Sequence, residues 1–98
     1  WVKRMKAVLN GTVLAESGDI VRVDGNPSFP RSAMREEFFR DSSHTTVCGW
    51  KGTARYWDVV LDGRAITNAV WSYETPKPEA DQIRERFAFY RGKGVEVS

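Results

Sequence analysis

The chain is poor in the side chains that most often carry catalysis or bind metals. Its 98 residues include one cysteine and one histidine. One cysteine cannot form a disulfide within the chain, and no apolar run approaches the roughly 18 residues that a membrane span requires. The apolar segment of a secretory signal is also absent. We therefore expect a cytoplasmic protein with no cofactor, no bound metal and no membrane contact.

Charge of one sign is not concentrated anywhere in the chain. The 15 basic and 13 acidic residues leave a net charge of +2, and the two signs are interleaved, as in Arg84-Glu85-Arg86. A nucleic-acid-binding protein usually shows a basic stripe. We therefore expect no nucleic-acid partner, and nucleic-acid binding through stacked aromatic rings is the least favoured interpretation.

Short β-favouring segments separated by turn signals fill most of the sequence. Strands are expected at residues 6–10, 12–16, 20–24, 51–61, 69–73 and 95–97. Asn10-Gly11 predicts a type I′ hairpin turn, and Asp62-Gly63 marks a second turn. Many short strands at regular spacing are typical of a small closed or folded-over antiparallel sheet.

Helices are expected to be short and few. The sequence predicts them at residues 32–39 and 79–86, and residues 87–90 either continue the second helix or begin a strand. Because long crossover helices are missing, the sequence disfavours a parallel α/β fold. We therefore expect residues 5–98 to form a single, mainly β, antiparallel domain with one or two short helices. Residues 1–4 are expected to be a flexible or artificial end.

The chemically versatile side chains gather on one segment, residues 44–52. Cys48 could serve as a nucleophile or redox thiol if the imidazole of His44, acting as base, or the ammonium of Lys51 lowered its pKa. In an extended strand, however, His44 and Cys48 would lie roughly 13 Å apart. No third residue that would orient them is evident. Zinc bound by His44, Cys48 and Asp58 would have too few ligands for a structural site.

The aromatic side chains favour a pocket more strongly. Tyr56 and Trp57 are adjacent on an expected strand, so they point to opposite faces and one of them should face away from the core. A sheet face lined by Trp and Tyr, with a Lys at its edge, suits a small-ligand pocket. Such rings can recognise a cation, whereas recognition of an anion would depend on Lys51 and Arg55. The residues predicted to bind ligand are Trp50, Lys51, Tyr56, Trp71 and Tyr73.

Two functions follow from these residues. The preferred one is a binding protein, monomer or homodimer, whose pocket takes a small molecule or a peptide end, with His44 and Cys48 at its wall. The alternative is a thiol-dependent enzyme that uses Cys48 with His44.

Several segments together resemble a known family. They are residues 6–8, 10–11, 46–56, 69–73 and 88–90, and the most specific is the box formed by Cys48, Trp50, Lys51 and Gly52. This set is similar to domain-of-unknown-function family 427, which usually has proline where this chain has Gly49. The resemblance implies a compact barrel-like domain, similar to the β-tent-like ligand-binding domain of cereblon.

The family's relatives and labels imply little about function. The β-tent relatives commonly hold structural zinc with paired Cys-x-x-Cys knuckles, which a single cysteine excludes. The family also carries a nucleotidyltransferase-like label. This sequence has neither a glycine-rich phosphate loop nor the paired acidic residues that such chemistry requires.

Overall fold

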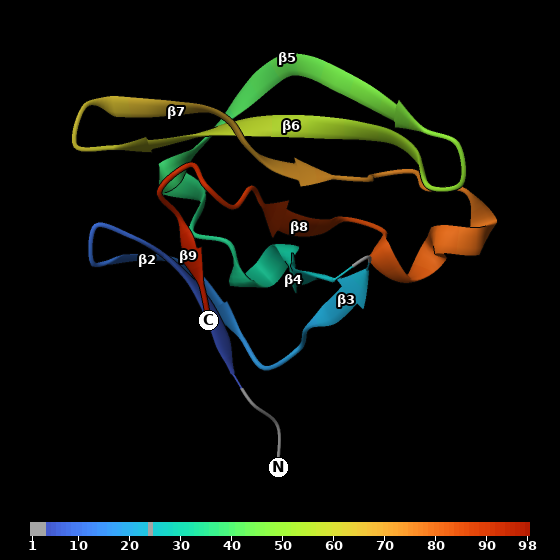
Figure 1. Ribbon diagram of the computed structural model, residues 1–98, viewed down its shortest axis with the longest axis horizontal. Coiled ribbons are helices and arrows are strands. Elements are labelled where there is room, and N and C mark those ends of the chain that lie inside the picture. The colour runs from blue at the N-terminus through green and yellow to red at the C-terminus, as the bar shows by residue number, and fades with distance from the viewer. Residues whose placement is uncertain (1–3, 24) are drawn as a thin grey trace.

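Two antiparallel sheets contain most of the residues that the computed structural model describes, 4–23 and 25–98 (Figure 1). Residues 1–3 of the expected N-terminal end 1–4, and the last residue of the expected strand 20–24, lie outside this part of the chain. The smaller sheet has the order β2-β1-β9. Its strands are β1 (Met5–Leu9), β2 (Thr12–Ser17) and β9 (Glu96–Val97).

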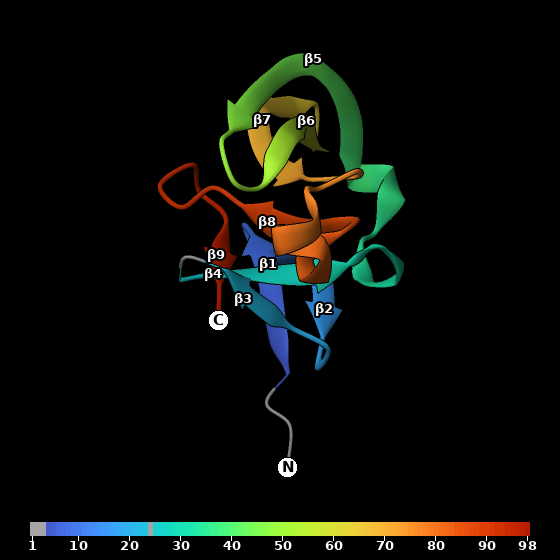
Figure 2. The same cartoon turned by 90° about the vertical axis from the view of Figure 1, so that its right-hand side faces the viewer.

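The larger sheet has six strands in the order β3-β4-β8-β7-β6-β5. They are β3 (Val21–Val23), β4 (Asn26–Pro30), β5 (Phe39–Cys48), β6 (Gly52–Leu61), β7 (Arg64–Ser72) and β8 (Arg86–Phe89). The long strands β5, β6 and β7 lie at one end of the molecule, and the smaller sheet lies toward the other (Figures 1 and 2). Figure 2 shows β5 curving around β6 and β7.

The two predicted turns form as the sequence indicates. Asn10 and Gly11 have φ values of 49° and 81°, and Asp62 and Gly63 have φ values of 52° and 76°. Two consecutive positive φ angles are the signature of a type I′ turn, which matches the twist of the strands that it joins. The first turn joins β1 to β2, and the second joins β6 to β7.

The main core lies between the two sheets. Its fully buried side chains include Leu14 of the smaller sheet and Phe29, Val59 and Val70 of the larger one. A second, smaller cluster covers the opposite face of β6 and β7. It contains Ala54, Tyr56, Tyr73, Ala80 and Ile83.

Both faces of β6 are therefore buried at its centre. Trp57 packs in the main core and is 8% exposed, whereas Tyr56 packs in the second cluster and is 5% exposed. Tyr56 faces away from the main core, as the alternation of side chains along a strand predicts. It does not face open solvent.

The mainly β, antiparallel fold class is confirmed, but the two sheets do not close into a barrel. Helix formation at residues 32–39 was predicted wrongly. Only two short 3₁₀ turns form there, η1 (Arg31–Ala33) and η2 (Glu36–Phe38). Met34 pairs with Ala15 of β2 between them, and the amide of Arg35 donates to the carbonyl oxygen of Leu14. Pairing with β2 thus prevents a continuous helix.

The second expected helix is likewise only a 3₁₀ segment, η3 (Pro78–Ile83). Ala80 interrupts it with φ −118° and ψ 23°. The segment at 87–90 resolves as a strand, since Arg86–Phe89 forms β8. Among the described residues, no helix has the length and apolar content to cross a membrane.

Candidate functional site

Four of the five side chains predicted to bind ligand line one pocket. It has a volume of about 430 Å³ and lies beside β6 and β7. Its lining residues are Asn26, Lys51, Tyr56, Trp71, Tyr73, Tyr90 and Arg91. Trp71 is half-buried, and Tyr90 and Arg91 are exposed, so the pocket is open to solvent.

Strand pairing places the aromatic rings together. Tyr56 on β6 lies opposite Trp71 on β7, and directly paired residues share one face of a sheet. Tyr90 follows β8, where its amide donates to the carbonyl oxygen of Ala69 at 2.8 Å. The ring centroid of Tyr90 lies 4.7 Å from that of Trp71 and 6.1 Å from that of Tyr56, the latter in a stacked arrangement.

Three hydroxyl groups form a chain into the pocket. The Tyr56 hydroxyl lies 2.9 Å from Thr46 Oγ1 and 3.4 Å from the Tyr90 hydroxyl. The hydrogen bond with Tyr56 raises the pKa of Tyr90 above its usual value, and burial and the charge of an ionised Tyr56 raise it further. The Tyr90 hydroxyl therefore remains protonated, and able to donate, at neutral pH.

The turn between β5 and β6 positions Lys51. The carbonyl oxygen of Lys51 accepts from the Lys77 amide at 2.9 Å, and Lys77 Nζ donates to the Gly49 carbonyl oxygen at 2.7 Å. Gly52 ends the turn at φ 112°, a conformation that favours glycine. The Cys-x-Trp-Lys-Gly box thus forms the turn that positions Lys51 at the pocket.

Trp50 does not line the pocket but contacts a residue that does. Its side chain is 42% exposed, and the ammonium of Lys51 lies 5.1 Å from its ring centroid. The same ammonium lies 5.8 Å from the ring centroid of Tyr73. The Lys51 ammonium therefore lies between the Trp50 ring, which is outside the pocket, and the Tyr73 ring, which lines it.

His44 and Cys48 both lie on β5 and approach the site through Tyr56. The exposed ring of His44 is 4.7 Å from that of Tyr56, measured between centroids. Cys48 is half-buried and packs against the second cluster, which contains Tyr56. Four residues of extended strand separate His44 from Cys48 by about 13 Å. Direct activation of the thiol by His44 finds no support in this geometry.

Asp58, considered from sequence as a zinc ligand, is engaged elsewhere. Asp58 accepts from the backbone amide of Asn68 at 2.9 Å, a bond that joins β6 to β7 where their pairing is irregular. It also accepts from Arg40 of β5 at 3.3 Å. Within residues 4–23 and 25–98, no three His, Cys, Asp or Glu side chains gather as a metal site.

The expectation that Arg55 serves anion recognition beside Lys51 is wrong. Arg55 lies 5.3 Å from the Trp57 ring, on the opposite face of the sheet, and donates to Glu74 at 2.6 Å. That contact, the charge of Glu74 and the more distant Asp41 raise the pKa of Arg55, although burial opposes them.

Sequence reasoning missed three lining residues, Asn26, Tyr90 and Arg91. Tyr90 belongs to the family-like segment 88–90, so a signal for it existed. Asn26 and Arg91 reach the pocket from β4 and from the turn after β8, and no local pattern indicates this.

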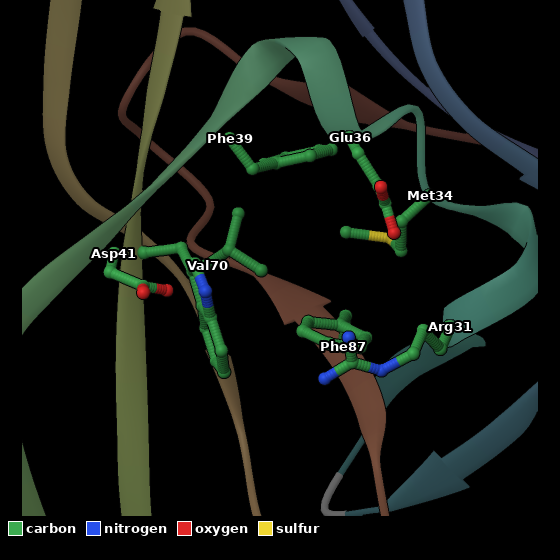
Figure 3. Close-up of a pocket in the computed structure, with 8 residues that line it drawn as sticks. Arg31, Met34, Glu36, Phe39, Asp41, Val70 and Phe87 are labelled. Atoms are coloured by element: carbon green, nitrogen blue, oxygen red, sulfur yellow. The ribbon is translucent and has the colours of Figure 1, made fainter.

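A second pocket of about 240 Å³ lies on the other face of the larger sheet (Figure 3). It is lined by Arg31, Met34, Glu36, Phe39, Asp41, Trp57, Val70 and Phe87. Figure 3 shows the Arg31 side chain beside the Phe87 ring, with Glu36 and Asp41 on different sides of the pocket. Arg31 also lies 3.7 Å from Glu74, so this pocket mixes both signs of charge and its cation is already paired.

Comparison with known proteins places the chain by family alone. Residues 2–97 match the family described as "Domain of unknown function (DUF427)", which confirms the resemblance carried by the sequence motifs. No curated protein matches the chain.

Proposed function

The chain belongs to the DUF427 family, and from this premise we propose that its aromatic pocket binds a small molecule or a peptide end. One observation carries the proposal. Rings from separate segments, Tyr56, Trp71, Tyr73 and Tyr90, converge around a solvent-open pocket of about 430 Å³. Ligand sites typically occupy roughly 300–1,000 Å³ and combine aromatic walls with a few polar groups.

Partial exposure distinguishes two of these rings, Trp71 and Tyr90, from ordinary core. Trp71 is half-buried and Tyr90 is 39% exposed, although the main core lies on the other face of the same sheet. Leaving apolar surface in water costs about 25 cal/mol per Å². A contiguous aromatic surface beside cationic and hydroxyl groups supports a binding role.

The aromatic pocket is the better candidate of the two. The smaller pocket holds Arg31, Glu36 and Asp41, and Arg31 and Asp41 already face oppositely charged groups of the chain. The aromatic pocket is larger and contains most of the residues that the sequence indicates. Cys48 and His44 are not among the residues that line the pocket, and in this proposal they only pack near Tyr56.

A fragment screen by amide correlation spectroscopy tests the proposal. Fragments that bind should shift the indole N–H signal of Trp71 and the amide signals of Tyr90 and Arg91. Tyr90→Ala should weaken these fragments because it removes a ring from the wall, and its exposed position makes the change tolerable. The matched control, Glu36→Gln, alters the other pocket and should leave binding unchanged.

Two results would contradict the proposal. One is a broad library in which no fragment shifts the Trp71 signal. The other is a set of fragments that shift the Trp57 indole signal and respond to Glu36→Gln but not to Tyr90→Ala.

A further inference from the structure

We propose that the ligand of the aromatic pocket carries a negatively charged group, a carboxylate or a phosphate, on a flat apolar body. This inference rests on the proposed function and adds the chemical class of the ligand. It follows from the charges, the hydrogen-bond donors and the ring faces of the pocket.

The charged side chains that line the pocket within the described residues are Lys51 and Arg91, both cations. Ammonium and guanidinium groups only donate hydrogen bonds and cannot accept them. Arg91 is exposed and forms no ion pair with any side chain at residues 4–23 and 25–98. The ammonium of Lys51 is already engaged by aromatic rings, so the exposed guanidinium of Arg91 is the charge that attracts an anion to this concave surface.

The neutral polar groups can donate as well. Thr46, Tyr56 and Tyr90 have three hydroxyl hydrogens, but the chain that links them uses only two. In the free protein Tyr90 donates to Tyr56, which is the direction that raises the pKa of Tyr90. When an anion accepts the Tyr90 hydrogen instead, both bonds reverse, so that Thr46 donates to Tyr56 and Tyr56 donates to Tyr90. The amide group of Asn26 adds further donors at the wall.

The ring faces disfavour the opposite class, an organic cation. Aromatic cages bind cations through the negative faces of their rings. Here Lys51 already lies over the Tyr73 ring, and Lys93 lies 5.2 Å from the Tyr90 ring centroid. An incoming cation would meet these ammonium groups. In the described structure no cation lies over Trp71, so its face is left for a flat apolar body.

Matched probes separate charge from shape. Phenylpropionate, phenylpropionamide and phenylpropylamine share a phenyl ring and a short chain but are anionic, neutral and cationic. Phenyl phosphate distinguishes phosphate from carboxylate. Each is titrated into the isotope-labelled full chain at low and at high salt, and the dissociation constant is read from the Trp71 and Tyr90 signals.

We expect the better anion to bind about three- to tenfold more tightly than the amide, since charge-assisted hydrogen bonds are the stronger ones. The amine should bind most weakly. High salt should reduce the advantage of the anion. Arg91→Gln should remove most of that advantage while leaving amide binding unchanged, and the control Arg35→Gln, outside the pocket, should have no effect.

The outcomes distinguish this inference from the proposed function. If the amide binds at Trp71 as tightly as both anions, or if the amine binds most tightly, the pocket is a binding site but the inference of an anionic ligand is wrong. If Arg91→Gln weakens the anion and the amide equally, the charge of Arg91 is not what selects the ligand, and the inference also fails. If none of the four probes shifts the pocket signals, both proposals are contradicted.

Discussion

Replacement of Tyr56 by phenylalanine tests how the pocket wall is held together. The substitution keeps the buried ring and removes only the hydroxyl, which contacts Thr46 at 2.9 Å and Tyr90 at 3.4 Å. Thr46 is exposed and Tyr90 is 39% exposed, so water can replace the lost partner of each. No buried polar group is therefore left without a partner.

The expected cost is that of one good neutral hydrogen bond, about 1 kcal/mol in the free energy of unfolding. The 3.4 Å contact adds little because it is long. For a domain of this size, about 1 kcal/mol lowers the melting temperature by roughly 4–8 °C. Tyr90→Phe, which loses only the long contact, should cost less than Tyr56→Phe.

A double-mutant cycle measures the contact with Thr46 directly. Urea denaturation of the Tyr56→Phe and Thr46→Val single variants and of the double variant should give a coupling energy of about 0.5–1 kcal/mol. Zero coupling would refute the hydrogen bond as the cause. A loss above about 3 kcal/mol would instead indicate that repacking dominates.

The same substitution predicts a change in pH dependence. The Tyr56 hydrogen bond is the largest cause of the raised pKa of Tyr90, so Tyr56→Phe should lower that pKa toward 10.0, seen by ultraviolet titration of tyrosinate. Because the pKa of Tyr90 is higher in the folded than in the unfolded protein, its protonated hydroxyl stabilises the fold at any pH below the unfolded pKa. This stabilisation is lost as the pH rises through the folded-state pKa. The stability deficit of Tyr56→Phe should therefore be largest near neutral pH and should shrink above about pH 10. An unchanged Tyr90 pKa would contradict this account.

Three further stability predictions follow from the fold. Ser72 is fully buried, and its hydroxyl has no hydrogen-bond partner in the described residues. Ser72→Ala should therefore raise the free energy of unfolding by about 1 kcal/mol. A clear loss of stability on urea denaturation would show that the hydroxyl does have a partner. Glu74→Gln should lower it by about 0.5–1 kcal/mol because the ion pair with Arg55 is partly exposed, and the loss should shrink in high salt if charge is its cause. Gly52→Ala should lower the free energy of unfolding by about 1–3 kcal/mol because Gly52 has a positive φ. The control Gly49→Ala, whose added methyl group meets open space, should be neutral or slightly stabilising. Equal losses of stability for the two variants in thermal melts would refute the role assigned to this turn.

The parts of the fold predicted from sequence are those with local causes. Asn10-Gly11 and Asp62-Gly63 form turns because their backbone preferences require no distant partner. Strand β5 was missed because residues 40–46 are polar. As an edge strand with one neighbour, β5 exposes most of its side chains, so the apolar alternation that indicates a strand is absent.

The site was predicted in the same uneven way. Four lining residues could be predicted because strand alternation and aromatic content are visible within short segments of sequence. They are Lys51, Tyr56, Trp71 and Tyr73. Arg91 could not be found because its approach to the pocket depends on how β8 pairs with β7, a long-range contact. Two expected helices failed for a related reason, since pairing with β2 and the formation of β8 override local helix preference.

A crystal structure of the protein with phenylpropionate tests the central claim most directly. The account predicts density for the phenyl ring against Trp71 and Tyr90, with the carboxylate directed toward Arg91. Density for the compound only in the pocket between Arg31 and Phe87, or at neither pocket under saturating conditions, would contradict it.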